Sequence, residues 1–320
     1  MSTVRRCAAL GVVAATLMLG ASEARAYCRT TTCDPERREC TRDAKGCAVA
    51  GTPLYWASEC VSFVVHQAGS ARHGIDATLF ASEVSAAFQR WLEVDCGGGR
   101  TPKLTVQNLG PVECGRVEYN QRGGNANIFM FRDEEWPYVG GEDALGLTTI
   151  RFDPKSGRIY DVDVEINGAS GIPISVGKPR EGAADLASIL THEVGHFLGL
   201  SHTVAENATM RPAYEIGRDL TKLGDDDRAG ICEALAPDRV TETQSCAPRH
   251  GFSSRCGGTK GGCSVARPGA GSGSELALGA LAIALGAARA RRRARRDAEP
   301  TRSAGIAGRP SSRAVRRTAD

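Results

Sequence analysis

Eleven residues of this chain have the types and spacing of a metal-dependent hydrolytic site. They read His192-Glu193-Val194-Gly195-His196-Phe197-Leu198-Gly199-Leu200-Ser201-His202. On a helix, His192 and His196 lie one turn apart, so both imidazoles leave the same face. Gly199 allows the backbone to leave the helix sharply, and the turn brings His202 round as a third imidazole. Three neutral imidazoles and a water form a catalytic zinc site, where Glu193 can accept the proton of the attacking water.

The stretch follows the pattern H-E-x-x-H-x-x-G-x-x-H and resembles the signature of the metzincin proteases. Metzincins carry a methionine turn beneath the metal, and Met210 follows closely in Ala208-Thr209-Met210-Arg211-Pro212-Ala213-Tyr214. Thr203, directly after the third histidine, is of the type usual in the matrixin branch. The resemblance implies a zinc endopeptidase in which three histidines bind one zinc ion, Glu193 is the general base, and Met210 supports the site.

The same resemblance implies how a protein or peptide substrate is held. Leu147 and Thr148 would lie on the strand at the edge of the cleft, whose backbone pairs with an extended substrate. Pro212 and Tyr214 take the positions that wall the S1′ pocket, which favours bulky apolar residues at P1′. The family usually has tyrosine directly after the methionine, and here the residue is Arg211. Turned into the pocket, Arg211 would favour acidic residues instead.

Residues 53–240 have the order of elements that a matrixin-like catalytic domain requires. The resemblance implies an α+β fold, with a twisted mixed β-sheet, three main helices including the zinc helix, and the methionine turn. Apolar periodicity, caps and turn residues predict the elements. They are strands at 60–66, 103–108 and 127–132, a helix beginning at Asp76 or Thr78 and reaching Leu92, a hairpin of strands 145–152 and 158–166 around 153–157, a zinc helix capped by Asp185, and a last helix beginning at 225–227 and ending before Pro237.

The first 26 residues predict export. Arg5 and Arg6 precede an apolar run, and Ala24-Arg25-Ala26 fits a signal-peptidase site, so 1–26 are predicted to be a signal peptide. The alternative, an N-terminal membrane anchor, requires a longer apolar run. Residues 27–52 are polar and rich in cysteine, which predicts a disulfide-tied segment without a core of its own. Ten cysteines suit up to five disulfides in an oxidising compartment, with their pairing left open: Cys28, Cys33, Cys40, Cys47, Cys60, Cys96, Cys114, Cys232, Cys246 and Cys256.

The last eighty residues predict a linker and a membrane-sorting tail. We expect a Gly/Ser-rich flexible linker with a sorting motif at 241–274, a short transmembrane segment at 275–290 and a basic cytoplasmic tail at 291–320. A cysteine motif at Cys263, a short apolar segment and an arginine cluster, in this order, resemble the MYXO-CTERM sorting tail of myxobacterial surface proteins. The resemblance implies a sorting protease that cuts near Cys263 and leaves the product at the cell surface or secreted. Taken alone, the apolar segment also fits an amphiphilic tail.

Charge argues against a nucleic-acid partner. Residues 27–288 hold 26 Lys and Arg against 33 Asp and Glu, a net charge of −7, although the whole chain carries +3. The net positive charge of the whole chain comes from the two termini, where arginines that set the orientation in a membrane explain it. Calcium stays open as a second cofactor: Asp133-Glu134-Glu135, or the set Asp161, Asp163 and Glu165, could bind it, and solvated carboxylates are the plainer reading.

A second function is compatible with the same sequence. A surface-displayed binding or adhesion protein with a non-catalytic zinc site would also need disulfides and an anchor. It gives no reason for Glu193 to stand between two metal ligands. The remaining histidines, His66, His73 and His250, do not fit a structural zinc pattern, so we expect one zinc ion.

Overall fold

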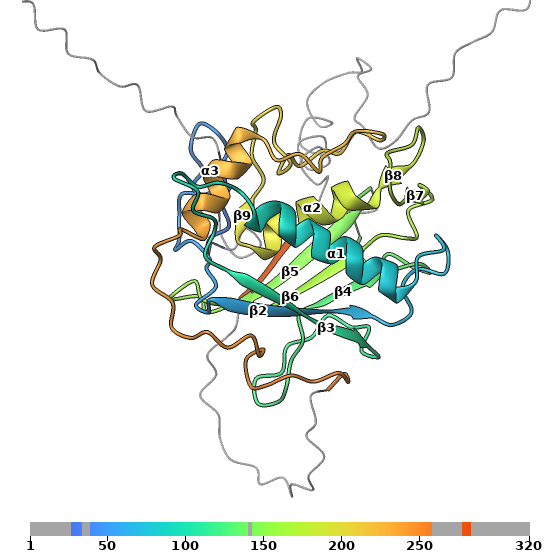
Figure 1. Ribbon diagram of the computed structural model, residues 1–320, viewed down its shortest axis with the longest axis horizontal. Coiled ribbons are helices and arrows are strands. Elements are labelled where there is room, and N and C mark those ends of the chain that lie inside the picture. Colours follow the sequence, from blue (N-terminus) through green and yellow to red (C-terminus); the bar gives the residue numbers. More distant parts are fainter. Residues whose placement is uncertain (1–26, 34–38, 140–142, 258–276, 283–320) are drawn as a thin grey trace, which may run out of the picture.

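The computed structural model describes residues 27–33, 39–139, 143–257 and 277–282 (Figure 1). The predicted signal peptide, Cys263 and the basic tail lie outside the described residues. Within these described ranges, no helix is long and apolar enough to cross a membrane. Of the predicted transmembrane segment 275–290, the structure describes only 277–282, and these residues form a β-strand. The predicted transmembrane segment therefore has no support in the described part of the chain.

A mixed sheet forms the centre of the fold. Its six strands, of which only β5 runs opposite to the others, lie in the order β3 (Thr105–Val112), β2 (Cys60–His66), β4 (Ile128–Phe131), β6 (Ile159–Ile166), β5 (Gly146–Phe152) and β10 (Ala277–Ala282). β5 runs antiparallel to β6, and β10 runs antiparallel to β5. Four two-residue strands pair outside the sheet, β1 (Cys28–Arg29) with β9 (Leu200–Ser201) and β7 (Ile174–Ser175) with β8 (Ala184–Asp185).

Two helices cover one face of this sheet. α1 (Ala77–Leu92) and α2 (Leu186–Phe197) lie across it together, and α3 (Asp225–Ala234) lies beside the N-terminal segment (Figure 1). Asp76 caps α1 by accepting a hydrogen bond from the amide of Leu79 at 2.8 Å. Asp185 caps α2 in the same way, with the amide of Ser188 at 2.9 Å. The predicted α+β fold with three main helices is confirmed.

Aromatic side chains fill the layer between helices and sheet. Phe88 of α1 and Phe197 of α2 meet edge to face with ring centroids 4.9 Å apart, and both pack on Phe129 of β4. Burying such rings stabilises the fold by about 1.5–3 kcal/mol for each fully buried side chain. The indole nitrogen of Trp91 also donates to the carbonyl of Thr191 at 2.8 Å, so α1 is fixed against the middle of α2.

The hairpin of β5 and β6 confirms the turn predicted at 153–157. The Asp153 carboxylate accepts the amides of Lys155 at 2.8 Å and Ser156 at 3.0 Å, and Gly157 has a φ of 79°. The hydrogen bond from the backbone of Ser156, followed by that from the Tyr160 hydroxyl, lowers the pKa of Asp153 to about 2.

The prediction for strand 103–108 was partly wrong, because β3 runs four residues further, to Val112. β3 is the edge of the sheet beside β2, and its continuation contains Pro111 and Gly110. Proline and glycine in a sequence both indicate that a segment is not a central strand, but an edge strand tolerates them.

All ten candidate cysteines form disulfides. Cys28–Cys47 and Cys33–Cys40 close loops inside the N-terminal segment, as its composition predicted. Three long-range bonds join Cys60 to Cys246, Cys96 to Cys232 and Cys114 to Cys256. The prediction of a flexible linker was therefore wrong for 241–257, since two disulfides tie this stretch to the sheet and its loops. The Gly and Ser content of the stretch contains no information about the partners of its cysteines.

Candidate metal and catalytic site

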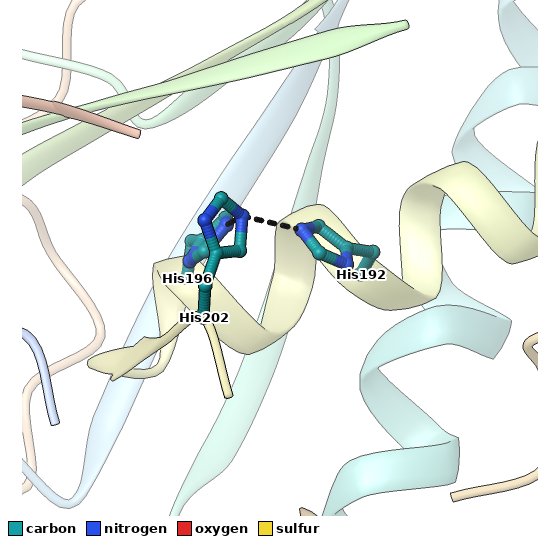
Figure 2. A group of neighbouring side chains, drawn as sticks. All are labelled: His192, His196 and His202. Atoms are coloured by element: carbon teal, nitrogen blue, oxygen red, sulfur yellow. Dashed lines mark hydrogen bonds between the residues drawn. The ribbon is translucent and has the colours of Figure 1, made fainter. Parts of the chain in front are cut away.

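Three imidazoles converge at the end of α2 and the turn that follows it (Figure 2). The Nε2 atom of His202 lies 3.2 Å from the Nε2 atom of His192 and 3.2 Å from that of His196. Ligand nitrogens about 2.0–2.1 Å from a tetrahedral zinc ion stand about 3.3 Å from one another. These nitrogen separations are therefore those of neighbouring metal ligands, and the residues present fit a zinc ion.

The other ring nitrogens fix the orientation of two imidazoles. Nδ1 of His192 lies 2.7 Å from the carbonyl oxygen of Thr209, and Nδ1 of His196 lies 3.0 Å from that of Leu200. A carbonyl can only accept, so each Nδ1 carries the proton and each Nε2 presents a lone pair. This tautomer is the one that a metal ion requires.

Burial keeps the three rings neutral. It lowers the pKa of His196 to about 4, and it also lowers the pKa values of His192 and His202, where neighbouring imidazoles contribute next. Arg42 of the N-terminal segment adds a smaller lowering of the pKa of His202. Neutral imidazoles bind a cation without first releasing a proton.

Glu193 lies buried between α2 and β5. Its Oε2 accepts a hydrogen bond from Thr148 Oγ1 at 2.5 Å, whereas its Oε1 is buried and has no partner among the described residues. Burial raises the pKa of Glu193 to about 8, and the hydrogen bond from Thr148 acts against that rise. A cation beside the carboxylate would favour its charged form.

The methionine turn packs beneath α2. A Cβ atom on Gly195 would stand 2.3 Å from Met210 Sδ and 2.9 Å from the ring of Trp91, so only glycine fits there. The Asp227 carboxylate accepts the amides of Thr209 at 2.7 Å and Met210 at 3.1 Å. One buried carboxylate thus fixes the turn, and through the carbonyl of Thr209 it also fixes His192.

Replacing Gly195 with alanine is expected to destabilise the protein by about 1–3 kcal/mol, because the added methyl group overpacks a filled core. Chemical denaturation followed by fluorescence measures the free energy of unfolding. In a double-mutant cycle with Met210→Ala, the two losses should be less than additive, because the second change removes the nearest clashing atom. Strict additivity would contradict the proposed clash.

The four residues expected to hold substrate lie in different environments. Leu147 of β5 is buried against Trp136 and Tyr138. Pro212 is partly exposed, and Tyr214 is buried in the main core. The Tyr214 hydroxyl accepts the amide of Asp185 at 3.0 Å, which links the segment after the methionine turn to the start of α2.

Arg211 does not have to enter a pocket to find a partner. Its Nη1 donates to the carbonyl oxygen of Glu206 at 3.3 Å, on an exposed part of the turn. The N-terminal segment also reaches this region, because β1 pairs with β9 immediately before His202. The amide of Thr30 extends that pairing to the carbonyl of Gly199 at 3.0 Å.

In the described part of the chain, no three of the acidic groups considered for calcium bring their oxygens within 4.8 Å of one another. Asp133 is already engaged, since its carboxylate accepts from Ser70 Oγ at 2.8 Å and from the amide of Arg72. Asp163 accepts the amides of Glu118 and Ile128. Asp161, however, is buried, and neither of its carboxylate oxygens has a hydrogen-bond partner among the described residues. Calcium binding therefore stays a prediction. Apart from the three histidines, one other group of converging donor atoms occurs among the described residues, and it contains the disulfide-bonded Cys114 and Cys256.

Sequence reasoning placed Thr148 on the substrate strand but did not find its side-chain contact with Glu193. It also did not find the close approach of Gly195 to Met210. The sequence contained a signal for each. Thr148 places a hydroxyl among the apolar residues of a buried strand, and Gly195 is a glycine inside a helix, where it costs about 1 kcal/mol relative to alanine.

Comparison with known proteins agrees with this geometry. Residues 118–235 match the family model described as Matrixin. Metalloendoproteinase 1-MMP of Arabidopsis thaliana is 33% identical over 104 residues, which are 30% of this chain and 26% of that protein. Metalloendoproteinase 5-MMP of the same plant is 29% identical over 153 residues, 46% and 37% of the two chains. Stromelysin-3 of Rattus norvegicus is 33% identical over 112 residues, 35% and 21% of the two chains.

The aligned segments thus cover about a quarter of the first of these relatives and 21% of the last. The segment that the family model matches extends from just before β4 to the end of α3, so it contains the three histidines, Glu193 and Met210. β2, α1 and β3 precede it and complete the sheet and its helical cover. Residues 118–235 of this chain are therefore similar to the Matrixin family, and they lie within the mixed α+β architecture described above.

Proposed function

We propose that this chain is a zinc-dependent metalloendopeptidase. The observation that supports it best is that His202 Nε2 lies 3.2 Å from the Nε2 atoms of both His192 and His196, with a buried carboxylate next to His192 in sequence. His192, His196 and His202 would hold the zinc ion. When bound, zinc acts as a Lewis acid on the scissile carbonyl and lowers the pKa of a water towards about 7.

Residues of the chain would carry out the proton transfers of the reaction and support the metal site. Glu193 accepts the proton of the attacking water at Oε1, the oxygen that has no other partner, and later delivers a proton to the leaving amine. Met210 and Asp227 hold the turn beneath the histidines. The alternative, a surface binding protein with a non-catalytic zinc site, leaves this buried and unpartnered oxygen without a role.

A fluorogenic peptide assay tests the proposal. The purified chain should cleave a quenched peptide, lose that activity to a zinc chelator, and regain it on addition of zinc in slight excess. A chain that binds about one zinc ion but cleaves neither peptides nor unfolded proteins would favour the alternative. Metal analysis of the same preparation separates that result from a failure to load zinc.

An extended substrate would pair with the outer edge of β5, which β10 occupies from Leu147 to Phe152. The register places Ala282 opposite Leu147 and Leu281 opposite Thr148. Substrate pairing therefore requires β10 to leave this edge. A chain ending at residue 262 is expected to have a KM several-fold lower than the chain that retains β10, with a similar kcat. Steady-state kinetics on both chains check this, and an equal KM would contradict competition at β5.

Specificity at P1′ is proposed to be apolar. Pro212 and Tyr214 follow the methionine turn, and burying an aliphatic or aromatic P1′ side chain there would contribute about 1.5–3 kcal/mol. We expect cleavage before Leu, Ile, Phe or Met when sites in a denatured protein are mapped by mass spectrometry. A preference for Asp or Glu that disappears in Arg211→Ala would assign the pocket to Arg211 instead.

We also propose that the protein is exported, because it has five disulfides and disulfides persist in oxidising compartments. The signal peptide, the sorting protease near Cys263 and attachment to a membrane stay predictions, as does calcium. Mass spectrometry of the mature protein would locate both ends of the chain and so test the two processing sites.

A further inference from the structure

The strand β5 presents alternate residues to the carboxylate of Glu193. Successive side chains of a strand point to opposite faces, so Gly146, Thr148 and Ile150 share the face that α2 covers. Ile150 belongs to the main core, and a Cβ atom on Gly146 would lie 2.6 Å from Glu193 Oε1. Thr148 lies between them, with its Oγ1 2.5 Å from Glu193 Oε2.

The two oxygens of Glu193 are therefore in different surroundings. Oε2 accepts from Thr148, while Oε1 lies beside Gly146, where a Cβ atom would clash with it, and has no partner among the described residues. The hydroxyl of Thr148 has one proton and two acceptors near it, Oε2 at 2.5 Å and the Glu193 carbonyl at 3.4 Å. The shorter bond is the stronger one, and a charged carboxylate would strengthen it further.

We propose that Thr148 is a positioning residue for the general base. Its hydroxyl holds Oε2, so the Glu193 side chain keeps one orientation and Oε1 stays free for the proton of water. A threonine suits this role because its β-branch restricts χ1, and the hydroxyl is thus aimed before substrate arrives. The role rests on the proposed peptidase function. It is distinct from backbone pairing with substrate, since pairing would use the main chain at the edge of β5, whereas this role uses the buried side chain of Thr148.

Three variants of the full chain test the proposal. Thr148→Val removes the hydroxyl and keeps the shape, and it should lower kcat by ~10- to 100-fold with KM within about twofold, because a hydrogen bond to a charged group is lost. Thr148→Ser restores the hydroxyl and should recover kcat to within a few-fold of the natural chain. Thr149→Val makes the same chemical change one residue along, on the other face of β5, and should leave kcat within about twofold.

Two measurements other than activity accompany the kinetics. Zinc content should stay at about one ion in every variant, since none of them changes a ligand. A crystal structure of metal-free Thr148→Val should have the Glu193 carboxylate in a different or multiple orientation, whereas Thr148→Ser should keep it in place.

Several results would overturn the proposal. They are a Thr148→Val enzyme as fast as the natural chain, a Thr148→Ser enzyme as slow as Thr148→Val, loss of zinc from Thr148→Val, or an unmoved Glu193 in its crystal structure. If the natural chain itself hydrolyses no peptide, the peptidase proposal fails. The crystal structures then still decide whether Thr148 positions Glu193.

Discussion

Glu193→Ala is expected to lower kcat by ~10²- to 10⁴-fold while the protein keeps its zinc, because general acid–base catalysis contributes a factor of that size. The carboxylate is buried and its Oε1 has no partner among the described residues, so alanine at 193 leaves the attacking water without this proton acceptor. The three imidazoles are held by their own contacts with Thr209 and Leu200 and by one another, and alanine at 193 leaves these contacts intact.

Steady-state cleavage of a quenched peptide, with zinc content measured on the same sample, checks this expectation. Glu113→Ala is a matched control, because Glu113 is exposed and distant in sequence from the site. Its kcat should equal that of the natural chain. A Glu193→Ala protein that retains full activity would remove Glu193 from the mechanism, whereas one that loses zinc would assign it to the metal site.

His202→Ala is expected to abolish zinc retention and, with it, activity. Its Nε2 is the atom that stands 3.2 Å from both other nitrogens, and its removal leaves two ligands one helical turn apart. Loss of a group that only supports a ligand weakens metal affinity by about 10–100-fold, so loss of a ligand should weaken it by more than ~10²-fold. The natural chain treated with chelator should show the same inactivity and recover on addition of zinc.

Competition with a chromophoric zinc chelator measures the affinity of each protein. The matched control is His250→Asn, since His250 is exposed with a φ of 66°, which asparagine tolerates. This variant should bind zinc as the natural chain does. A His202→Ala protein with unchanged zinc affinity would mean that the metal lies elsewhere, and the convergence of the three rings would then have another cause.

The sequence determined those features that depend on local spacing. His192 and His196 share a face because a helix repeats every 3.6 residues, and Asp185 begins that helix because its side chain can cap an amide three residues on. The hairpin of β5 and β6 follows from Asp153 and Gly157 for the same reason. Each of these features involves residues only a few positions apart.

Other features were decided by tertiary structure, because they join residues whose distance in the sequence places no constraint on their distance in space. Cys60 and Cys246 are 186 residues apart, and their pairing makes 241–257 part of the fold although its composition predicted a linker. Thr148 and Glu193 are 45 residues apart and meet only because the sheet and α2 pack face to face. Close packing likewise explains Gly195. A glycine is locally unfavourable in a helix, but a larger residue at this position would clash with the sulfur of Met210.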